Sequence, residues 1–258
     1  MTGYLEDRNR GQSVLTRLDH LVILVQDLDR ATEDYERLGF RVIPGGEHAD
    51  GLTRNALVPF GDGTYLELVA FIDPEDDQDN VWGWREFLPH EGLIDYCAAS
   101  DGLPEDVRRL RDLGFEVDGP HEGGRRLPDG RKILWRSASF AQGERVLPFM
   151  IEDLTPRETR VPTGPDTSHP NGATGIRRLE IAASDAQEAT KNLAALAAVE
   201  PEHLKLGACE LFPVDMCTEQ GPGPVAVELS TAPSENIGAL DRSLAHGVRF
   251  TLSPEADS

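Results

Sequence analysis

A carboxylate within an apolar strand is the most informative chemical feature of the sequence. Glu67 lies between Leu66 and Leu68, and burying a charged carboxylate among such neighbours costs free energy unless a partner is present. We therefore expect Glu67 to face a polar cavity, with an ion pair to Arg54 as the alternative. His20 lies in a strand-like run of its own, where it serves either as a pocket residue or as a satisfied structural group.

Three residues near Glu67 in the sequence suit the binding of a polar substrate. His48 lies in the glycine-rich segment 45–51, which predicts either a loop that closes over a cavity or a plain surface histidine. Arg54 and Asn55 lead into a predicted strand. From that wall they could hold a polar substrate.

The second half of the chain offers a further set. Trp135 and Arg136 are adjacent in a predicted strand, so their side chains face opposite sides. One of them is expected to face the cavity, as an aromatic wall or as a guanidinium that binds a carboxylate. Glu152 ends a strand beside Asp153. It is either a pocket residue able to move protons or part of a solvated strand end.

These residues fall on a pattern of elements that occurs twice. Each occurrence has a strand, a helix that ends at a glycine, and three more strands. The first unit has strands at 17–25, 40–42, 54–60 and 65–71 and a helix near 28–38. The second has strands at 92–98, 125–127, 133–137 and 146–151 and a helix near 103–113. The helix exits, residues 38–42 and 113–117, repeat almost residue for residue, and such repetition is a strong indicator of fold.

The repeat gives a division into domains. We expect a disordered lead-in at 1–14 and two paired βαβββ modules, 15–73 and 92–155, that form one unit over 15–155. A Pro/Thr/Gly/Ser-rich stretch at 156–174 is predicted to be a linker. Residues 175–258 are expected to form a third, partial βαβββ-like module and a tail, with strands at 176–182, 209–212 and 225–229 and a helix at 186–198.

Composition excludes several classes of function. The net charge of −21 repels phosphate backbones and anionic lipid heads, so neither nucleic acid nor a membrane is expected as a partner. Three scattered cysteines, with no signal sequence before them, favour a reducing, cytoplasmic location. The glycines at 221 and 223 alternate with prolines, which lack the amides that bind phosphate, so no nucleotide cofactor is expected.

A duplicated βαβββ unit with a histidine on its first strand and a glutamate on its fourth resembles the vicinal-oxygen-chelate superfamily. That superfamily includes glyoxalase I, extradiol dioxygenases and bleomycin-resistance proteins, and the chain looks most like bacterial glyoxalase-like domain proteins. The resemblance rests on residues 18–22, 63–68, 126–130, 135–136, 147–152 and 169–172. It implies an α+β fold in which repeated βαβββ modules form curved, cup-like mixed sheets.

The resemblance also implies a ligand set for a divalent metal ion. Relatives hold the ion with the first and fourth strands of both modules, which correspond here to His20, Glu67 and Glu152. Zinc, nickel, manganese and iron all accept such a set. The first strand of the second module departs from the pattern, since it has Asp95 and Tyr96 where a histidine is expected. Tyr96 could instead hydrogen-bond a substrate.

From these residues we favour an enzyme: a glyoxalase-type lyase or isomerase that acts on a small molecule with vicinal oxygens, with Glu67 and Glu152 as catalytic carboxylates. One alternative is a non-catalytic protein that sequesters a small molecule, as bleomycin-resistance relatives do. An extradiol-type dioxygenase ranks last, because it needs two histidines and one carboxylate on iron. A homodimer is open as well, since relatives often pair modules between chains, although two modules here could close a cup within one chain.

Overall fold

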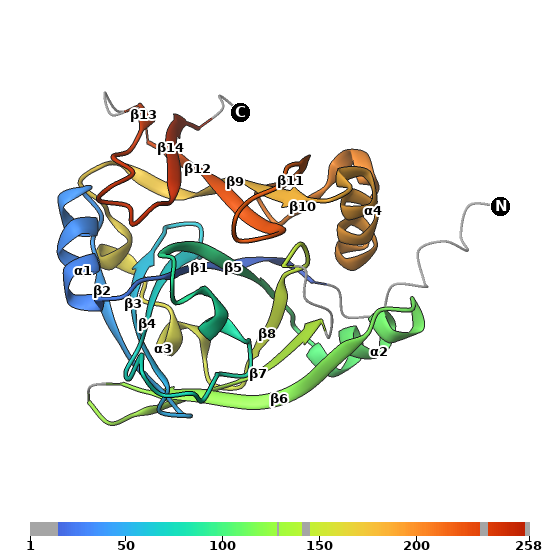
Figure 1. Ribbon diagram of the computed structural model, residues 1–258, viewed down its shortest axis with the longest axis horizontal. Coiled ribbons are helices and arrows are strands. Elements are labelled where there is room, and N and C mark those ends of the chain that lie inside the picture. The colour runs from blue at the N-terminus through green and yellow to red at the C-terminus, as the bar shows by residue number, and fades with distance from the viewer. Residues whose placement is uncertain (1–14, 128, 141–144, 233–236, 256–258) are drawn as a thin grey trace.

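The computed structural model describes residues 15–127, 129–140, 145–232 and 237–255, so the predicted lead-in lies outside the described residues. The chain builds a closed eight-stranded barrel and a separate six-stranded sheet that lies against it (Figure 1). The barrel strands are β1 (Arg17–Leu24), β2 (Ile43–His48), β3 (Thr53–Pro59), β4 (Tyr65–Phe71), β5 (Gly92–Ala99), β6 (Val117–Arg126), β7 (Lys132–Phe140) and β8 (Phe149–Asp153). The fold is therefore α+β with strongly curved mixed sheets, as the sequence predicted.

Each half of the barrel is one βαβββ module. The strand order is β1-β4-β3-β2-β6-β7-β8-β5, so the modules join where β1 pairs with β5 and where β2 pairs with β6. Helix α1 (Leu28–Arg37) begins at Asp27, whose side chain accepts hydrogen bonds from the amides of Asp29 and Arg30. Helix α2 (Leu103–Asp112) has a proline in its first turn. The two helices thus start differently.

The helix exits that repeat in the sequence also repeat in the structure. Gly39 and Gly114 both have a positive φ, 85° and 95°, which is the left-handed conformation that glycine adopts without strain. The amides of the next residues, Phe40 and Phe115, then bond back to the helix at 3.1 and 3.0 Å. Both modules therefore leave their helix along the same path.

The second sheet is formed by the C-terminal third of the chain. Its elements are β9 (Ala173–Ala183), α4 (Ala186–Ala197), β10 (Lys205–Leu206), β11 (Cys209–Asp215), β12 (Gly223–Thr231), β13 (Gly238–Ala239) and β14 (Arg249–Pro254). In the order β11-β9-β12-β14 the pairings are parallel, antiparallel and parallel. The barrel has the same sequence of pairings in β4-β1-β5-β8. The sheet therefore repeats the four strands at the module junction.

The two layers share one apolar core. Leu21 and Tyr96 on the outer face of the barrel pack in the same cluster as Ile181 and Leu229 of the second sheet. Because β1 is covered on both faces, its residues are buried from Leu18 to Leu24, and the last four of them are apolar. A second cluster, which includes Val22, fills part of the barrel interior.

The second strand lies further along the chain than the sequence suggested. It was expected at 40–42 and in fact spans Ile43–His48, so the segment predicted as a glycine-rich loop is a strand. The strand is bulged between Pro44 and Gly46, and Gly46 has φ 130°. Glycine here accommodates a bulge and a close neighbour instead of a loop.

Several connecting segments contain short helical turns. The stretch predicted as a linker contains the helical turn α3 (Arg157–Arg160) and the 3-10 turn Gly164–Thr167, and Figure 1 shows α3 inside the ring of barrel strands. A second 3-10 turn, Trp84–Phe87, precedes β5. The remaining 3-10 turn, Pro201–His203, follows α4.

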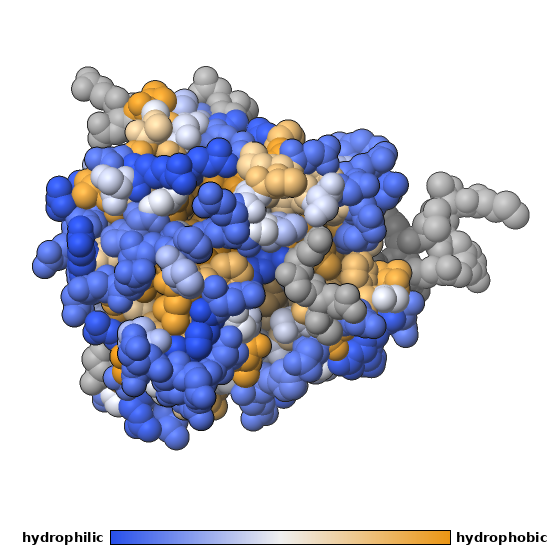
Figure 2. Space-filling view, viewed as in Figure 1, coloured by the Kyte–Doolittle hydropathy of each residue, from blue (hydrophilic) through white to orange (hydrophobic). Residues whose placement is uncertain are grey.

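The outer surface is strongly polar. Hydrophilic residues cover most of the face shown in Figure 2, in keeping with a net charge of −21. Within the described parts of the chain, no helix is long and apolar enough to span a membrane.

Candidate functional site

The barrel encloses one polar cavity. Its walls combine ionisable side chains with an aromatic surface, and both modules contribute. The lining residues are His20, His48, Asn55, Tyr65, Glu67, Trp82, Trp84, Arg125, Trp135, Phe149, Ile151 and Arg160. The cavity and its mouth enclose about 350 Å³. This volume is at the lower end of the range for ligand pockets, so the cavity suits a small ligand.

The carboxylate of Glu67 is the centre of the polar half. It is contacted by His20 Nε2 at 3.2 Å and by His48 Nε2 at 3.5 Å, on opposite carboxylate oxygens. The Asn55 side-chain amide also donates a hydrogen bond to it. These groups come from β1, β2, β3 and β4, which are neighbours in the order β1-β4-β3-β2. One module alone therefore assembles the centre of the site.

The Nδ1 atom of each imidazole is within hydrogen-bond distance of a neighbouring side chain. His20 Nδ1 lies 2.7 Å from Asp19 Oδ1, and His48 Nδ1 lies 2.6 Å from Thr53 Oγ1. Each ring therefore has a fixed orientation, with its Nε2 directed at Glu67. This arrangement, in which one ring nitrogen is anchored and the other is presented, is the one used by histidines that bind metals or substrates.

Neighbouring charges shift the pKa values of Glu67 and His20 in opposite directions. Burial raises the pKa of Glu67, but hydrogen bonds and charge from His20 and His48 outweigh it and hold the pKa well below its usual value. Burial lowers the pKa of His20, but Asp19 and Glu67 outweigh it and raise the pKa. A carboxylate thus lies at each ring nitrogen of His20 and favours its protonated form. The site thus holds an ionised carboxylate beside a proton donor.

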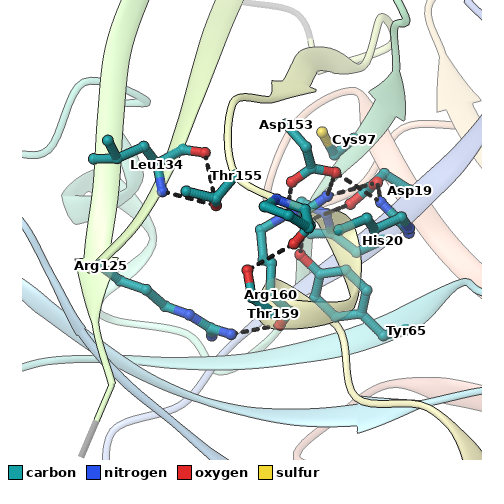
Figure 3. A network of polar contacts seen from close by, with 12 residues as sticks. Asp19, His20, Tyr65, Cys97, Arg125, Leu134, Asp153, Thr155, Thr159 and Arg160 are labelled. Atoms are coloured by element: carbon teal, nitrogen blue, oxygen red, sulfur yellow. Dashed lines mark hydrogen bonds and ion pairs between the residues drawn. The ribbon is translucent and has the colours of Figure 1, made fainter. Parts of the chain in front are cut away.

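A buried ion network supports His20 (Figure 3). Asp19 is fully buried and accepts hydrogen bonds from Arg160 at 2.9 and 3.0 Å and from Arg157. Arg160 also binds Asp153, at 2.5 and 2.9 Å, and the Tyr65 hydroxyl at 2.7 Å. Burial raises the pKa of Asp19, but the charge of Arg160 outweighs it and holds the pKa well below normal. The guanidinium groups of Arg157 and Arg160 therefore balance the charge of the buried Asp19 carboxylate.

A β-bulge explains why Asp19 and His20 both serve the interior. Successive residues of a regular strand face opposite sides, but the pairing of β1 with β5 shifts between Leu18 and His20. A bulge redirects a side chain. Asp19 therefore reaches Arg160 while its neighbour His20 faces Glu67.

Arg125 closes the cavity from the second module. Its NH1 donates to Asn55 Oδ1 at 3.2 Å and its NH2 donates to the Arg160 carbonyl at 2.6 Å. A Cβ at Gly45 would lie 2.0 Å from Asn55 Oδ1 and 2.7 Å from Arg125 NH1. Glycine at position 45 is therefore required for this close approach between the two modules.

Two groups of side chains are candidates for holding a metal ion. Among the described residues, the ligand atoms of Asp19, His20 and Cys97 lie within 4.8 Å of one another. This group does not fit a cation well. Asp19 already binds two arginines, and burial raises the pKa of the Cys97 thiol well above normal, whereas a metal needs the thiolate.

The second group fits better. His20, His48 and Glu67 are the donor types that borderline divalent metals accept. Their anchored rings direct both Nε2 atoms at the carboxylate. An ion there would replace the contacts that the two imidazoles now make with Glu67.

Five of the predicted residues line the cavity: His20, His48, Asn55, Glu67 and Trp135. His48 was placed in a lid or on the surface; it is instead buried at the end of β2. Trp135 provides the aromatic wall, and His48 packs edge-on against it with ring centroids 6.1 Å apart.

The structure does not bring Glu152 to this group. Phe149 and Ile151 line the cavity, so alternation along β8 turns Glu152 outward. There its Oε2 accepts a hydrogen bond from the Leu103 amide at 3.3 Å and lies 3.7 Å from Arg136 NH1. Arg136 is likewise on the outer face. The ligand set inferred from the resemblance is therefore incomplete, because the fourth strand of the second module presents apolar side chains.

Two more predicted residues point elsewhere. Arg54 is on the outer face of β3 and lies 3.4 Å from Asp29, not beside Glu67. Tyr96 is fully buried outside the cavity lining, where its hydroxyl donates to the Val146 carbonyl. Asp95, on the same strand, accepts hydrogen bonds from Trp84 Nε1 at 2.9 Å and from Arg145 at 2.7 Å.

Sequence reasoning missed several lining residues. Arg160 lies in the predicted linker, and Arg125 lies in a predicted strand without any signal that marks it. Trp82 and Trp84 stack with their ring centroids 4.6 Å apart and line the cavity. Tyr65 could have been found, because it lies two residues before Glu67 on the same face of β4.

Comparisons with known proteins agree with this architecture. A family model described as a glyoxalase-like domain matches residues 18–197. A hypothetical protein from Staphylococcus aureus has a similar structure, with a TM-score of 0.73 and 16% identity over 92% of this chain and 98% of that one. No curated protein sequence matches the chain.

Two further solved structures are more distant. A xylose isomerase-like TIM barrel/4-hydroxyphenylpyruvate dioxygenase fusion protein has a TM-score of 0.51 and 14% identity over 85% of this chain and 37% of its own. Methylmalonyl-CoA epimerase from Mycobacterium tuberculosis has a TM-score of 0.41 and 25% identity over 57% of this chain and 93% of its own. The likeness in structure concerns the fold, and the family model covers most of the chain. The chain belongs to the glyoxalase-like domain family of the vicinal-oxygen-chelate superfamily.

Proposed function

We propose that the protein is a glyoxalase-type lyase or isomerase that moves a proton between adjacent carbons of a small substrate with two neighbouring oxygens. One observation carries this proposal. The buried carboxylate of Glu67 is flanked by two anchored imidazoles whose Nε2 atoms lie 3.2 and 3.5 Å from its two oxygens. A base thus stands next to two donors in an enclosed, largely aromatic cavity.

In the proposed mechanism, the substrate competes with Glu67 for the two imidazoles. His20 and His48 each donate from Nε2 to one of the vicinal oxygens, which polarises the two adjacent carbons that carry them. Glu67 then loses the contacts that hold its pKa down, while burial, which raises its pKa, persists. Substrate binding therefore makes Glu67 a stronger base at the moment it is needed.

The imidazolium of His20 completes the proton transfer. As Glu67 removes a proton from carbon, negative charge develops on the substrate oxygens. His20 stabilises that charge, and Asp19 holds the ring in place through Nδ1 at 2.7 Å. His20 gives its Nε2 proton to the substrate carbonyl oxygen as the carbon proton leaves. Glu67 then returns its proton to the neighbouring carbon, while His20 takes up the proton of the adjacent hydroxyl, so that one proton moves between the carbons and one between the oxygens.

A divalent metal ion is compatible with the same residues. His20, His48 and Glu67 would hold it, and the ion would supply Lewis-acid stabilisation of an enediolate. Ions of zinc, nickel, manganese or iron suit such donors. Metal content measured by mass spectrometry on protein purified without chelator, with His20→Ala and His48→Ala beside it, tests this binding directly.

Proton exchange tests the proposed chemistry without knowledge of the physiological substrate. The protein is incubated in D₂O with hydroxyacetone, dihydroxyacetone, methylglyoxal and 2-oxo acids, and deuterium uptake at carbon is followed by NMR. We expect exchange above the buffer rate for at least one compound. Glu67→Gln should slow it about 10²-fold or more, because it removes the base while keeping the shape.

Glu152→Gln is the matched control. Its carboxylate is on the outer face of the barrel, so exchange should continue at the wild-type rate. Exchange that survives Glu67→Gln would contradict the role of Glu67. Binding of these compounds without any exchange would instead favour a sequestering protein, which the aromatic and aliphatic wall of the second module would suit.

One observation favours an extradiol-type dioxygenase as a second candidate. The sequence offered a single well-placed histidine, but the structure adds His48, so two imidazoles now contact the Glu67 carboxylate, one at each oxygen. That donor set is typical of non-haem iron(II) oxygenases. Oxygen uptake with catechols after loading with iron(II), lost in His48→Ala, would support this candidate over the isomerase.

A further inference from the structure

Two buried hydrogen-bond donors in the cavity wall have no partner among the described residues. They are Arg125 Nε and Trp135 Nε1. The two residues are 5% and 4% exposed, and both line the cavity. A buried donor without an acceptor costs free energy, so this pair indicates a ligand that supplies acceptor atoms.

The two donors lie on neighbouring strands and on the same side of the sheet. Trp135 of β7 is opposite Gly123 of β6, and Arg125 follows Gly123 by two residues. A Cβ at Gly123 would lie 2.7 Å from Trp135 Nε1. Glycine therefore keeps the space beside the indole N–H open.

The guanidinium of Arg125 is fixed in place by its other nitrogens. NH1 and NH2 bind the Asn55 side chain and the Arg160 carbonyl at 3.2 and 2.6 Å. Nε is the one nitrogen of this guanidinium that has no partner among the described residues. A fixed cation next to a neutral N–H donor suits a carboxylate better than a carbonyl or hydroxyl, because a carboxylate brings charge and no competing proton.

The position of Arg125 and Trp135 relative to Glu67 determines where the other atoms of the ligand lie. Asn55 contacts Arg125 through Oδ1 and Glu67 through Nδ2, so a single side chain separates the two places. An oxygen on the carbon next to the carboxylate would therefore face His20 and His48. The small volume admits only a short molecule.

We infer that Arg125 and Trp135 form a carboxylate subsite, and that the ligand of the cavity is a short 2-oxo or 2-hydroxy acid. This inference rests on the proposed function, since it names the class of substrate on which the acid–base group acts. The carboxylate binds the second module. The oxygen on carbon 2 and a second oxygen on carbon 3 bind the imidazoles of the first, and the proton moves between those two carbons.

Matched probes test the subsite by binding alone. Pyruvate and pyruvamide differ only in the carboxylate, as do lactate and lactamide. By calorimetry at pH 7, the protein should bind each acid at least about tenfold more tightly than its amide. Trp135→Phe keeps a ring in the wall but removes the N–H, and Gly123→Ala fills the space beside it; both should reduce this preference to about threefold or less.

NMR spectra distinguish a variant that has lost the contact with the ligand from a variant that has lost its fold. The chain has three tryptophans, so ¹⁵N-labelled protein gives three indole signals, and single Phe variants assign them. Pyruvate should shift the Trp135 indole signal, and pyruvamide should not. Trp84→Phe is the matched control, because the Trp84 N–H already donates to Asp95 at 2.9 Å; this variant should keep the preference for the acid.

Equal affinity of wild-type protein for acid and amide would overturn the carboxylate subsite. So would an unchanged preference in folded Trp135→Phe and Gly123→Ala proteins. Deuterium exchange on hydroxyacetone together with such equal affinities would refute the subsite while leaving the proposed isomerase intact. Tight, selective binding of pyruvate without any deuterium exchange would support the carboxylate subsite and contradict the proposed isomerase.

Discussion

Asp19→Asn is the substitution that most directly tests the internal ion network. Asp19 is fully buried and contacts His20 at 2.7 Å, Arg160 at 2.9 and 3.0 Å, and Arg157. The substitution keeps the size of the side chain but removes its charge, which leaves Arg160 with Asp153 as its remaining carboxylate partner. Loss of one partner from a buried ion pair costs about 3–5 kcal/mol.

We expect a loss near the lower end, about 3 kcal/mol, because asparagine can still accept one hydrogen bond. For a chain of this size that loss corresponds to a fall in Tm of about 6–12 °C. The pKa of His20 should fall as well, since Asp19 is one of the two groups that raise it. Urea denaturation and an NMR pH titration measure the two effects.

Asp118→Asn is the control. Asp118 also contacts a histidine, at 3.0 Å, but its side chain is 64% exposed, so the free energy of unfolding should change by less than about 0.5 kcal/mol. A loss below about 1 kcal/mol for Asp19→Asn, or an unchanged His20 titration, would refute the view that Asp19 carries a charge that the site needs.

Three further outcomes follow from burial and charge. Because the folded pKa of Glu67 is depressed, its contribution to stability is present above the unfolded value of about 4.3 and is lost as pH falls below it; the urea midpoint of Glu67→Gln should therefore depend less on pH between about 5 and 3. Of the free cysteines, only Cys217 is exposed, so a thiol reagent should modify one group in the folded protein and all three after denaturation. Gly45→Ala would place a Cβ 2.0 Å from Asn55 Oδ1 and should destabilise the protein by about 1–3 kcal/mol; Gly61→Ala, whose Cβ would meet nothing closer than 3.7 Å, should not.

The sequence predicted the modules and half of the site because those depend on local pattern. Helix exits at Gly39 and Gly114 mark the repeat, and a glutamate between leucines marks a buried carboxylate. The prediction that Glu152 faces the cavity was wrong by one residue of register, because alternation along β8 makes Ile151 the residue that faces inward. No local pattern separates these two choices.

Other parts of the site depend on contacts between distant segments. Arg160 reaches Asp19 from 141 residues away, and its segment was expected to be a linker because its composition is typical of one. The bulge that turns Asp19 inward arises from the pairing of β1 with β5, which the sequence of β1 does not reveal. His48 was placed in a loop because glycine signals a turn as readily as it signals a bulge.

The closure of the barrel within one chain bears on how the site depends on protein concentration. Both module junctions, β1 with β5 and β2 with β6, form between segments of the same polypeptide, and every residue that lines the cavity comes from that polypeptide. The strands that carry His20, His48, Asn55 and Glu67 are therefore neighbours within a single chain, without a strand from a second copy. If the proposed activity resides in this group, activity per molecule should stay constant on dilution.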